Sequence, residues 1–149
     1  MSRPRSTAPI LMAEDDPDDR LLAEEAWREA RIDNPLEFVE NGEEVLSFLR
    51  REGRFRDRVD HPMPALILLD LNMPRLNGRG VLKALKADAA LRRIPVVVLT
   101  TSQTEEDILR TYNLGVSSFI TKPMDFEELV RVLSVIGRYW LEIVELPQD

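Results

Sequence analysis

The chain has 149 residues, 44 % of them hydrophobic, which is enough for one core and too few for two domains of ordinary size. Its formal net charge of −7 argues against nucleic acid or an anionic membrane as a surface-wide partner. It has no cysteine, no apolar run of membrane-spanning length and a start, MSRPRSTAP, too short and polar for a signal peptide, so we expect a cytoplasmic protein.

Short apolar runs alternate with longer segments of helical period, which is typical of repeated strand and helix units around a parallel sheet. We predict five strands, at residues 10–13, 36–39, 65–69, 96–100 and 117–121. The third and fourth lack the polar alternation of a half-exposed strand, so helices should cover both faces of the sheet. The predicted fold class is an open, doubly wound α/β sandwich.

Local chemistry marks the starts of three helices. Asp16 can cap the first helix, with a proline at the first helical position and further aspartates in the first turn. Asn41 precedes the second helix, and Asp125 and Glu128 have the spacing of a capping box before the last. Residues 51–64 show neither a helical nor a strand period, so we interpret them as a loop.

That loop region is rich in arginine, and we interpret the arginines as a solvated face, with contact to a protein partner as the alternative: Arg50, Arg51, Arg54, Arg56 and Arg58. His61, the only histidine, is predicted to be a surface residue rather than a ligand. The two tryptophans, Trp27 and Trp140, are predicted to pack in the core.

The last helix carries two apolar stripes. One face, expected to meet the core, has Phe126, Leu129, Val130, Leu133, Ile136 and Trp140; the second stripe has Val132, Val135, Tyr139 and Ile143. The second stripe is either a protein interface or a face buried under the long loop.

Acidic residues gather where strands end. Glu14 and Asp15 follow the first strand, at the sheet edge where open α/β folds bind ligands, and Asp70 ends the third. If those strands are neighbours, the three carboxylates repel one another unless a cation lies between them. Oxygen donors without histidine or cysteine favour Mg²⁺, and the main-chain oxygen of Asn72 could add a ligand.

Two further strand ends supply complementary groups. Thr100 ends the fourth strand and Lys122 follows the fifth. A hydroxyl and an ammonium beside a metal-bound carboxylate suit an acyl phosphate, in which Asp70 attacks phosphorus, Mg²⁺ and Lys122 balance the oxygens and Thr100 donates a hydrogen bond.

The combined set of Glu14-Asp15, Asp70, Thr100 and Lys122-Pro123 resembles the receiver domain of two-component response regulators. The resemblance implies a flavodoxin-like, five-stranded parallel sheet of order 2-1-3-4-5. It also implies that Asp70 accepts phosphate from a phosphohistidine on a sensor histidine kinase.

The same resemblance assigns further roles around that aspartate. Asp15 would bind Mg²⁺ directly, Glu14 through water and Asn72 through its backbone carbonyl. Thr100 would be the switch hydroxyl and Phe119 the switch aromatic. Receiver domains usually hold the Lys-Pro bond cis, so the bond from Lys122 to Pro123 is expected to be cis.

The resemblance implies a single receiver domain over residues 1–149, with a core at about 9–141, a short N-terminal arm, an extended last helix and a tail. We expect no output domain and no direct binding of nucleic acid, so the signal leaves through a protein partner. The protein is expected to be a phosphoacceptor with Mg²⁺-dependent self-phosphorylation and slow autodephosphorylation, not a conventional enzyme.

The arginine-rich loop and the ending VIGRYWLEIVELP resemble single-domain regulators paired with phytochrome-type histidine kinases. Those regulators tend to dimerise, which predicts a homodimer through the face of the fourth helix, fifth strand and fifth helix.

Other functions fit the sequence less well. A phosphorelay shuttle uses the same site and stays open as an alternative. A phosphotransferase of the haloacid dehalogenase type needs a second aspartate two residues after the nucleophile, where this chain has Asn72. A flavodoxin must bind phosphate at its first turn, and EDDPDD would repel it. A pseudo-receiver would lack a site residue, and none is missing.

Overall fold

The computed structural model describes residues 8–58, 61–71, 78–100, 116, 118–123 and 125–143, with side chains up to residue 140 in the last range. The strands are β1 (Ile10–Ala13), β2 (Leu36–Val39), β3 (Leu66–Asp70), β4 (Val96–Thr100) and β5 (Ser118–Thr121). The α-helices in these ranges are α1 (Pro17–Glu29), α2 (Gly42–Arg50), α3 (Gly78–Ala87) and α5 (Phe126–Gly137). None of the helices so described has the length and apolar character to cross a bilayer.

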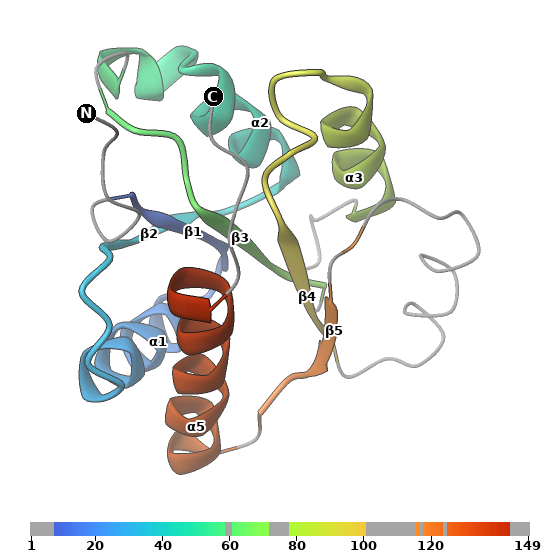
Figure 1. The fold of residues 1–149 in the computed structure, drawn as a ribbon. Helices are drawn as coiled ribbons and strands as arrows, with labels where there is room; N and C mark the ends of the chain where they lie inside the picture. Colours follow the sequence, from blue (N-terminus) through green and yellow to red (C-terminus); the bar gives the residue numbers. More distant parts are fainter. Residues whose placement is uncertain are drawn as a thin grey trace.

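The strands form one parallel sheet of order β2-β1-β3-β4-β5 (Figure 1), which confirms the predicted topology. The register pairs Ala13 with Leu69, Asp70 with Leu99, and Thr100 with Thr121, so the carboxyl ends of four strands lie at one edge. The third strand runs one residue later than predicted and ends on Asp70 itself, because that residue still pairs with β4.

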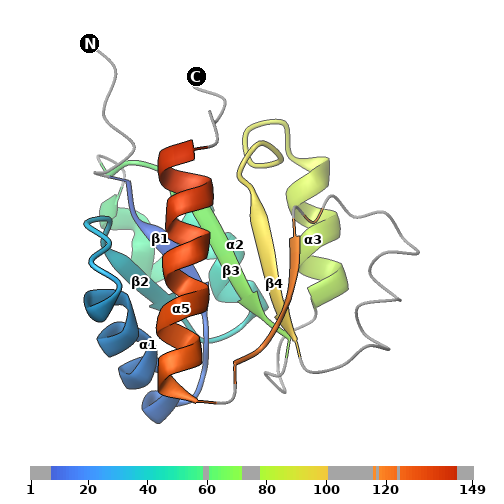
Figure 2. The same ribbon diagram turned by 60° about the horizontal axis from the view of Figure 1, so that its bottom comes forward.

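Helices cover both faces of the sheet, as predicted. Figure 2 shows α1 and α5 together in front of the sheet, with α2 and α3 behind it. Alternate residues of β1 serve the two layers: Ile10 and Met12 pack with the α1 and α5 side, and Leu11 and Ala13 with the α2 and α3 side. All residues of β1, β3 and β4 are buried, which explains their unbroken apolar character.

The helix starts are mostly as predicted. Asp16 accepts hydrogen bonds from the backbone amides of Asp18 and Asp19, and Asn41 caps α2 by accepting from the amide of residue 44. Asp125 accepts from the amide of Glu128 at 2.8 Å. The second half of that capping box is wrong, because the Glu128 carboxylate pairs with an arginine one turn further along α5.

The loop prediction for residues 51–64 is wrong in part, because Gly53–Arg58 forms a 3₁₀ helix. Phe55 anchors it: the ring is buried and packs edge to face on Phe48 of α2, with 5.2 Å between ring centroids. The Arg58 guanidinium lies over the Phe48 ring and forms a bidentate ion pair with the Glu37 carboxylate, at 2.7 and 2.8 Å. An apolar anchor two residues into an otherwise polar segment gives no periodic signal.

The first stripe of α5 meets the core, as predicted, except at its start. Leu133 and Ile136 are buried and Leu129, Val130 and Trp140 pack against the same cluster, while the Phe126 ring is 38 % exposed. Trp27 is also buried, which confirms its packing role. His61 is exposed, as expected of a surface residue.

The second stripe of α5 is divided. Val132 packs against the core, whereas Val135 and Tyr139 are 57 % and 50 % exposed. The Ile143 side chain and the fourth helix of the predicted dimer face lie outside the described part of the chain.

Candidate functional site

Four strand ends place the predicted site residues at one edge of the sheet. Glu14 follows β1, Asp70 and Thr100 are the last residues of β3 and β4, and Lys122 follows β5. The Lys122 amide donates to the Thr100 carbonyl at 3.1 Å, so the backbone of the lysine is fixed against the neighbouring strand. Parallel pairing therefore converts four distant sequence positions into one site.

At the centre of the site, two buried carboxylates share one ammonium. Asp70 is 1 % and Glu14 is 2 % exposed, and their side chains are hydrogen-bonded to each other. Lys122 Nζ lies 2.5 Å from Asp70 Oδ2 and 3.7 Å from Glu14 Oε1. The hydrogen bond and ion pair provide the buried Asp70 with the compensation that a desolvated charge needs.

Burial and neighbouring charges shift the pKa values of Glu14 and Lys122. Burial, the hydrogen bond to Asp70 and the negative charge of Asp70 together raise the pKa of Glu14 from 4.5 to about 7. Burial alone would lower the pKa of Lys122, but the hydrogen bond and charge of Asp70, with Glu14 and Asp19 adding to them, raise it overall. The raised pKa favours the protonated form of Lys122, and its single positive charge does not balance the negative charges of the carboxylates around it.

Asp19 is a member of the site that sequence reasoning missed. Its Oδ2 lies 3.8 Å from Lys122 Nζ, and its side chain is 43 % exposed. The sequence analysis explains the aspartates of the first helical turn, Asp19 among them, only by the helix dipole. The available signal was the place of Asp19 in the first turn of α1, which begins beside the same sheet edge.

The donor chemistry of the site fits a hard divalent cation. Three carboxylates, from Glu14, Asp70 and Asp19, surround one ammonium, which leaves a formal charge of −2 when all are ionised. All the donors are oxygens, which is the ligand type of Mg²⁺. The side chains of the described ranges nevertheless form no ready-made group of three metal ligands, and the cation nearest to Asp70 is the Lys122 ammonium.

The remaining predicted site residues differ in their placement. Thr100 is buried at the sheet edge, and Phe119 is half-buried against the core on the α2 and α3 side. Asp15 is half-exposed and has no ion pair or hydrogen bond within the described ranges, and Asn72 lies outside them. No described peptide bond is cis, so the expected cis bond before Pro123 is wrong and the bond is trans, the isomer that X-Pro bonds generally favour.

A mostly apolar cavity of about 150 Å³ adjoins the ammonium, between α1 and α5. Asp19 and Lys122 line it together with Leu22, Leu99 and Leu129. The lysine head therefore has open space on one side and the buried carboxylates within reach.

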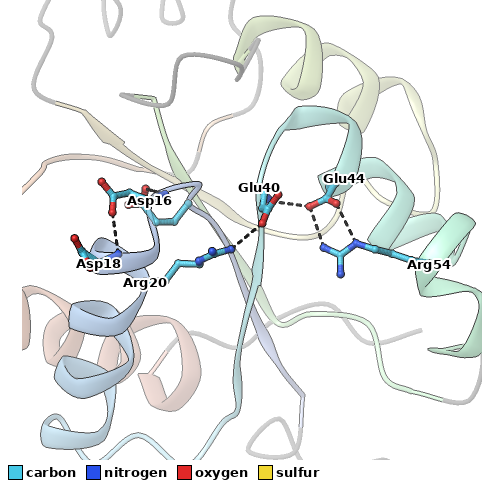
Figure 3. A network of polar contacts seen from close by, with 7 residues as sticks. Asp16, Asp18, Arg20, Glu40, Glu44 and Arg54 are labelled. Carbon is cyan, nitrogen blue, oxygen red and sulfur yellow. Dashed lines mark hydrogen bonds and ion pairs between the residues drawn. The ribbon is translucent and has the colours of Figure 1, made fainter.

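A chain of polar contacts joins the start of α1 to the 3₁₀ helix (Figure 3). Arg20 pairs with Glu40 at 3.2 Å, the Glu40 amide donates to Glu44, and Arg54 binds both Glu44 oxygens at 3.0 Å. The interpretation of the arginines as a solvated face is confirmed for Arg54, whose paired side chain is 60 % exposed, and is wrong for Arg58, whose side chain is 17 % exposed. These contacts brace the loop after β2, next to the site edge.

Comparisons with known proteins point to one family. The profile of the response regulator receiver domain matches residues 10–134. Response regulator Rcp1 of Synechocystis sp. is 40 % identical over 138 residues, which cover 93 % of this chain and 92 % of Rcp1. The Mn²⁺-bound form of Rcp1 superposes with a TM-score of 0.78 at 39 % identity, covering 95 % of this chain and 99 % of that one.

Two further crystal structures are similar over almost the whole chain. Response regulator RPA3017, in red light signalling of R. palustris, has a TM-score of 0.87 at 36 % identity, covering 95 % of this chain and 99 % of that one. The phosphorylated cyanobacterial phytochrome response regulator RcpA has a TM-score of 0.82 at 38 % identity with the same coverage.

Proposed function

Because the chain belongs to the family of response regulator receiver domains, we propose that it is a phosphoacceptor whose Asp70 takes a phosphoryl group from a phosphohistidine of a sensor histidine kinase. The observation that carries this proposal is the buried Asp70 carboxylate with the Lys122 ammonium at 2.5 Å. An aspartate in this position has the ammonium of Lys122 beside it, and that ammonium can pair with the oxygens of a phosphoryl group attached to Asp70.

The transfer is a displacement at phosphorus. An Asp70 carboxylate oxygen attacks, the bond between phosphorus and the histidine nitrogen breaks, and the nitrogen keeps the electron pair. Lys122 then pairs with the phosphoryl oxygens, and Thr100 donates a hydrogen bond to one of them. Asp15 and Asp70 would hold Mg²⁺ directly, Glu14 through water and Asn72 through its backbone carbonyl, and the bound ion would supply further compensation of the phosphoryl charge.

Phosphorylation adds a charge of roughly −1.5 to −2 and three acceptor oxygens at this edge. In the proposed switch, Thr100 moves toward the phosphoryl group and Phe119 fills the space that it leaves, which changes the face around β5 and α5. A complete switch needs about 5.5 kcal/mol of differential interaction, which several charge-assisted hydrogen bonds at one phosphate can supply.

The kinase partner proposed here is of the phytochrome type, which would place the protein in the cytoplasm. RcpA is a phytochrome response regulator and RPA3017 acts in red light signalling, and both match this chain over almost its full length. We propose that the chain forms one receiver domain and that it signals through a protein partner rather than by binding nucleic acid.

The phosphoacceptor is tested by incubating the full chain with acetyl phosphate and Mg²⁺ and measuring the intact mass. One added phosphoryl group is expected in the wild type and in the control Asp57→Asn, which alters an exposed aspartate of the 3₁₀ helix. No addition is expected in Asp70→Asn or with a chelator present. Phosphate mapped to a serine or to His61 contradicts the proposal.

We also propose that the exposed part of the second α5 stripe, Val135 and Tyr139, belongs to a homodimer interface. The support is two large apolar side chains, each at least half exposed and four residues apart, where α5 is followed directly by the π-helix Arg138–Ile143 that carries Tyr139. Tyr139→Glu should yield a monomer by light scattering, whereas Leu21→Glu, at an equally exposed leucine of α1, should leave the dimer intact. A wild-type monomer, or a dimer unaffected by Tyr139→Glu, would retire the interface.

A further inference from the structure

The three carboxylates around the Lys122 ammonium differ in burial and in distance. Asp70 and Glu14 are almost fully buried, and both belong to the proposed metal site, together with Asp15. Asp19 lies 3.8 Å from the ammonium but is 43 % exposed and stands on the first turn of α1. It is thus a partner for the lysine outside the buried pair.

A divalent cation and the lysine compete for the same oxygens. Lys122 Nζ is 2.5 Å from Asp70 Oδ2, so an ion bound to that carboxylate meets a like charge at short range. The ammonium must give up part of this contact before the ion can bind. The Lys122 side chain is only 24 % exposed, and a partly buried ammonium that loses its anion is destabilised, so a second anion nearby lowers the cost of the exchange.

We propose that Asp19 is a positioning residue that holds the Lys122 ammonium when a divalent cation takes the carboxylates of Glu14 and Asp70. The Asp19 backbone is fixed for this role, because its amide donates to the Asp16 side chain at the start of α1. The cavity of about 150 Å³ lined by both Asp19 and Lys122 gives the ammonium space to shift toward the helix. The inference rests on the proposed metal site, but not on phosphoryl transfer.

The neighbouring Asp18 is a matched control for charge and helix dipole. It lies on the same first turn, is exposed, and makes no ion pair with Lys122 within the described chain. Substitution of either aspartate by asparagine removes one negative charge near the same helix start. Only the Asp19 change removes a partner of the ammonium.

The experiment is a double-mutant cycle on metal affinity in the full chain, read from the electron paramagnetic resonance signal of unbound Mn²⁺. Asp19→Asn should raise the Kd for Mn²⁺ by about three- to fivefold, the upper range for an exposed ion pair, and Asp18→Asn by less than about twofold. Lys122→Met should lower the Kd because it removes the competing charge. In the Lys122→Met background, Asp19→Asn should have no larger effect than Asp18→Asn, and Asp19→Glu should restore the wild-type value in the original background.

Three results overturn the inference. They are a wild type that does not bind Mn²⁺, equal effects of Asp18→Asn and Asp19→Asn, and an effect of Asp19→Asn that persists in Lys122→Met, since Asp19 would then act on the metal directly. Thermal unfolding without metal confirms that each variant is folded, and Asp19→Ser serves if the asparagine variant is not. Phosphorylation of Asp70 is measured separately, so a wild type that shows the cycle but accepts no phosphoryl group contradicts the proposed function alone.

Discussion

The buried pair of Glu14 and Asp70 should make the metal-free protein less stable as pH rises toward neutrality. Burial, with the hydrogen bond and charge of Asp70, raises the pKa of Glu14 from 4.5 to about 7. The folded state therefore binds more protons than the unfolded state between these two values, and stability falls as pH rises through that window. The perturbation that isolates this term is Glu14→Gln, a neutral side chain of the same shape.

The magnitude follows from the shift. A difference of about 2.5 pH units at 1.36 kcal/mol per unit corresponds to about 3 kcal/mol of unfolding free energy. Glu14→Gln should exceed the wild type by less than about 0.5 kcal/mol at pH 4.5, where Glu14 is protonated in the folded state and half ionised in the unfolded state, and by about 3 kcal/mol at pH 8. Added Mg²⁺ should reduce that excess, because a cation binds only the ionised wild-type pair.

The assay is urea unfolding at several pH values between 4.5 and 8 with a chelator present. Taking the difference between wild type and variant cancels the titration of the groups that do not interact with Glu14. Glu24→Gln, at an exposed glutamate of α1, is the control and should follow the wild type at every pH. A difference between wild type and Glu14→Gln that is constant with pH would refute the assignment of a raised pKa to this carboxyl group.

Two predictions concern parts of the fold that brace the site. The paired guanidinium of Arg54 lowers the pKa of Glu44, so Glu44→Gln should lower the free energy of unfolding by about 0.5 kcal/mol at neutral pH, measured by urea unfolding. This loss should vanish on acidification through the lowered pKa, and an unchanged loss at low pH would contradict the ion pair. Trp27 Nε1 donates to the Asn34 carbonyl at 2.7 Å in a buried position, so Trp27→Phe should lower the melting temperature through a loss of about 1–3 kcal/mol, and a neutral result would show that water replaces the donor.

The site was predictable because its residues stand at positions that topology alone brings together. Asp70 ends an apolar strand, Thr100 ends the next and Lys122 follows the last, and in a parallel sheet all such ends share one edge. The contact of Asp70 with Lys122 was therefore inferable without coordinates. The 3₁₀ helix at residues 53–58 was not predictable, because it depends on one buried ring, Phe55, that packs on α2.

The sequence by itself determined the five strands, the covered sheet and the identity of the central acid, since hydrophobic period and strand-end chemistry are local properties. The strand order was implied by the resemblance to receiver domains, because local periodicity does not say which strands are neighbours. Only the tertiary structure decided which charges compensate one another. It brought Asp19 within 3.8 Å of the Lys122 ammonium that already pairs with Asp70, and it buried Glu14 deeply enough to raise its pKa. Distances and burial in three dimensions set these energies, and no spacing along the chain encodes them.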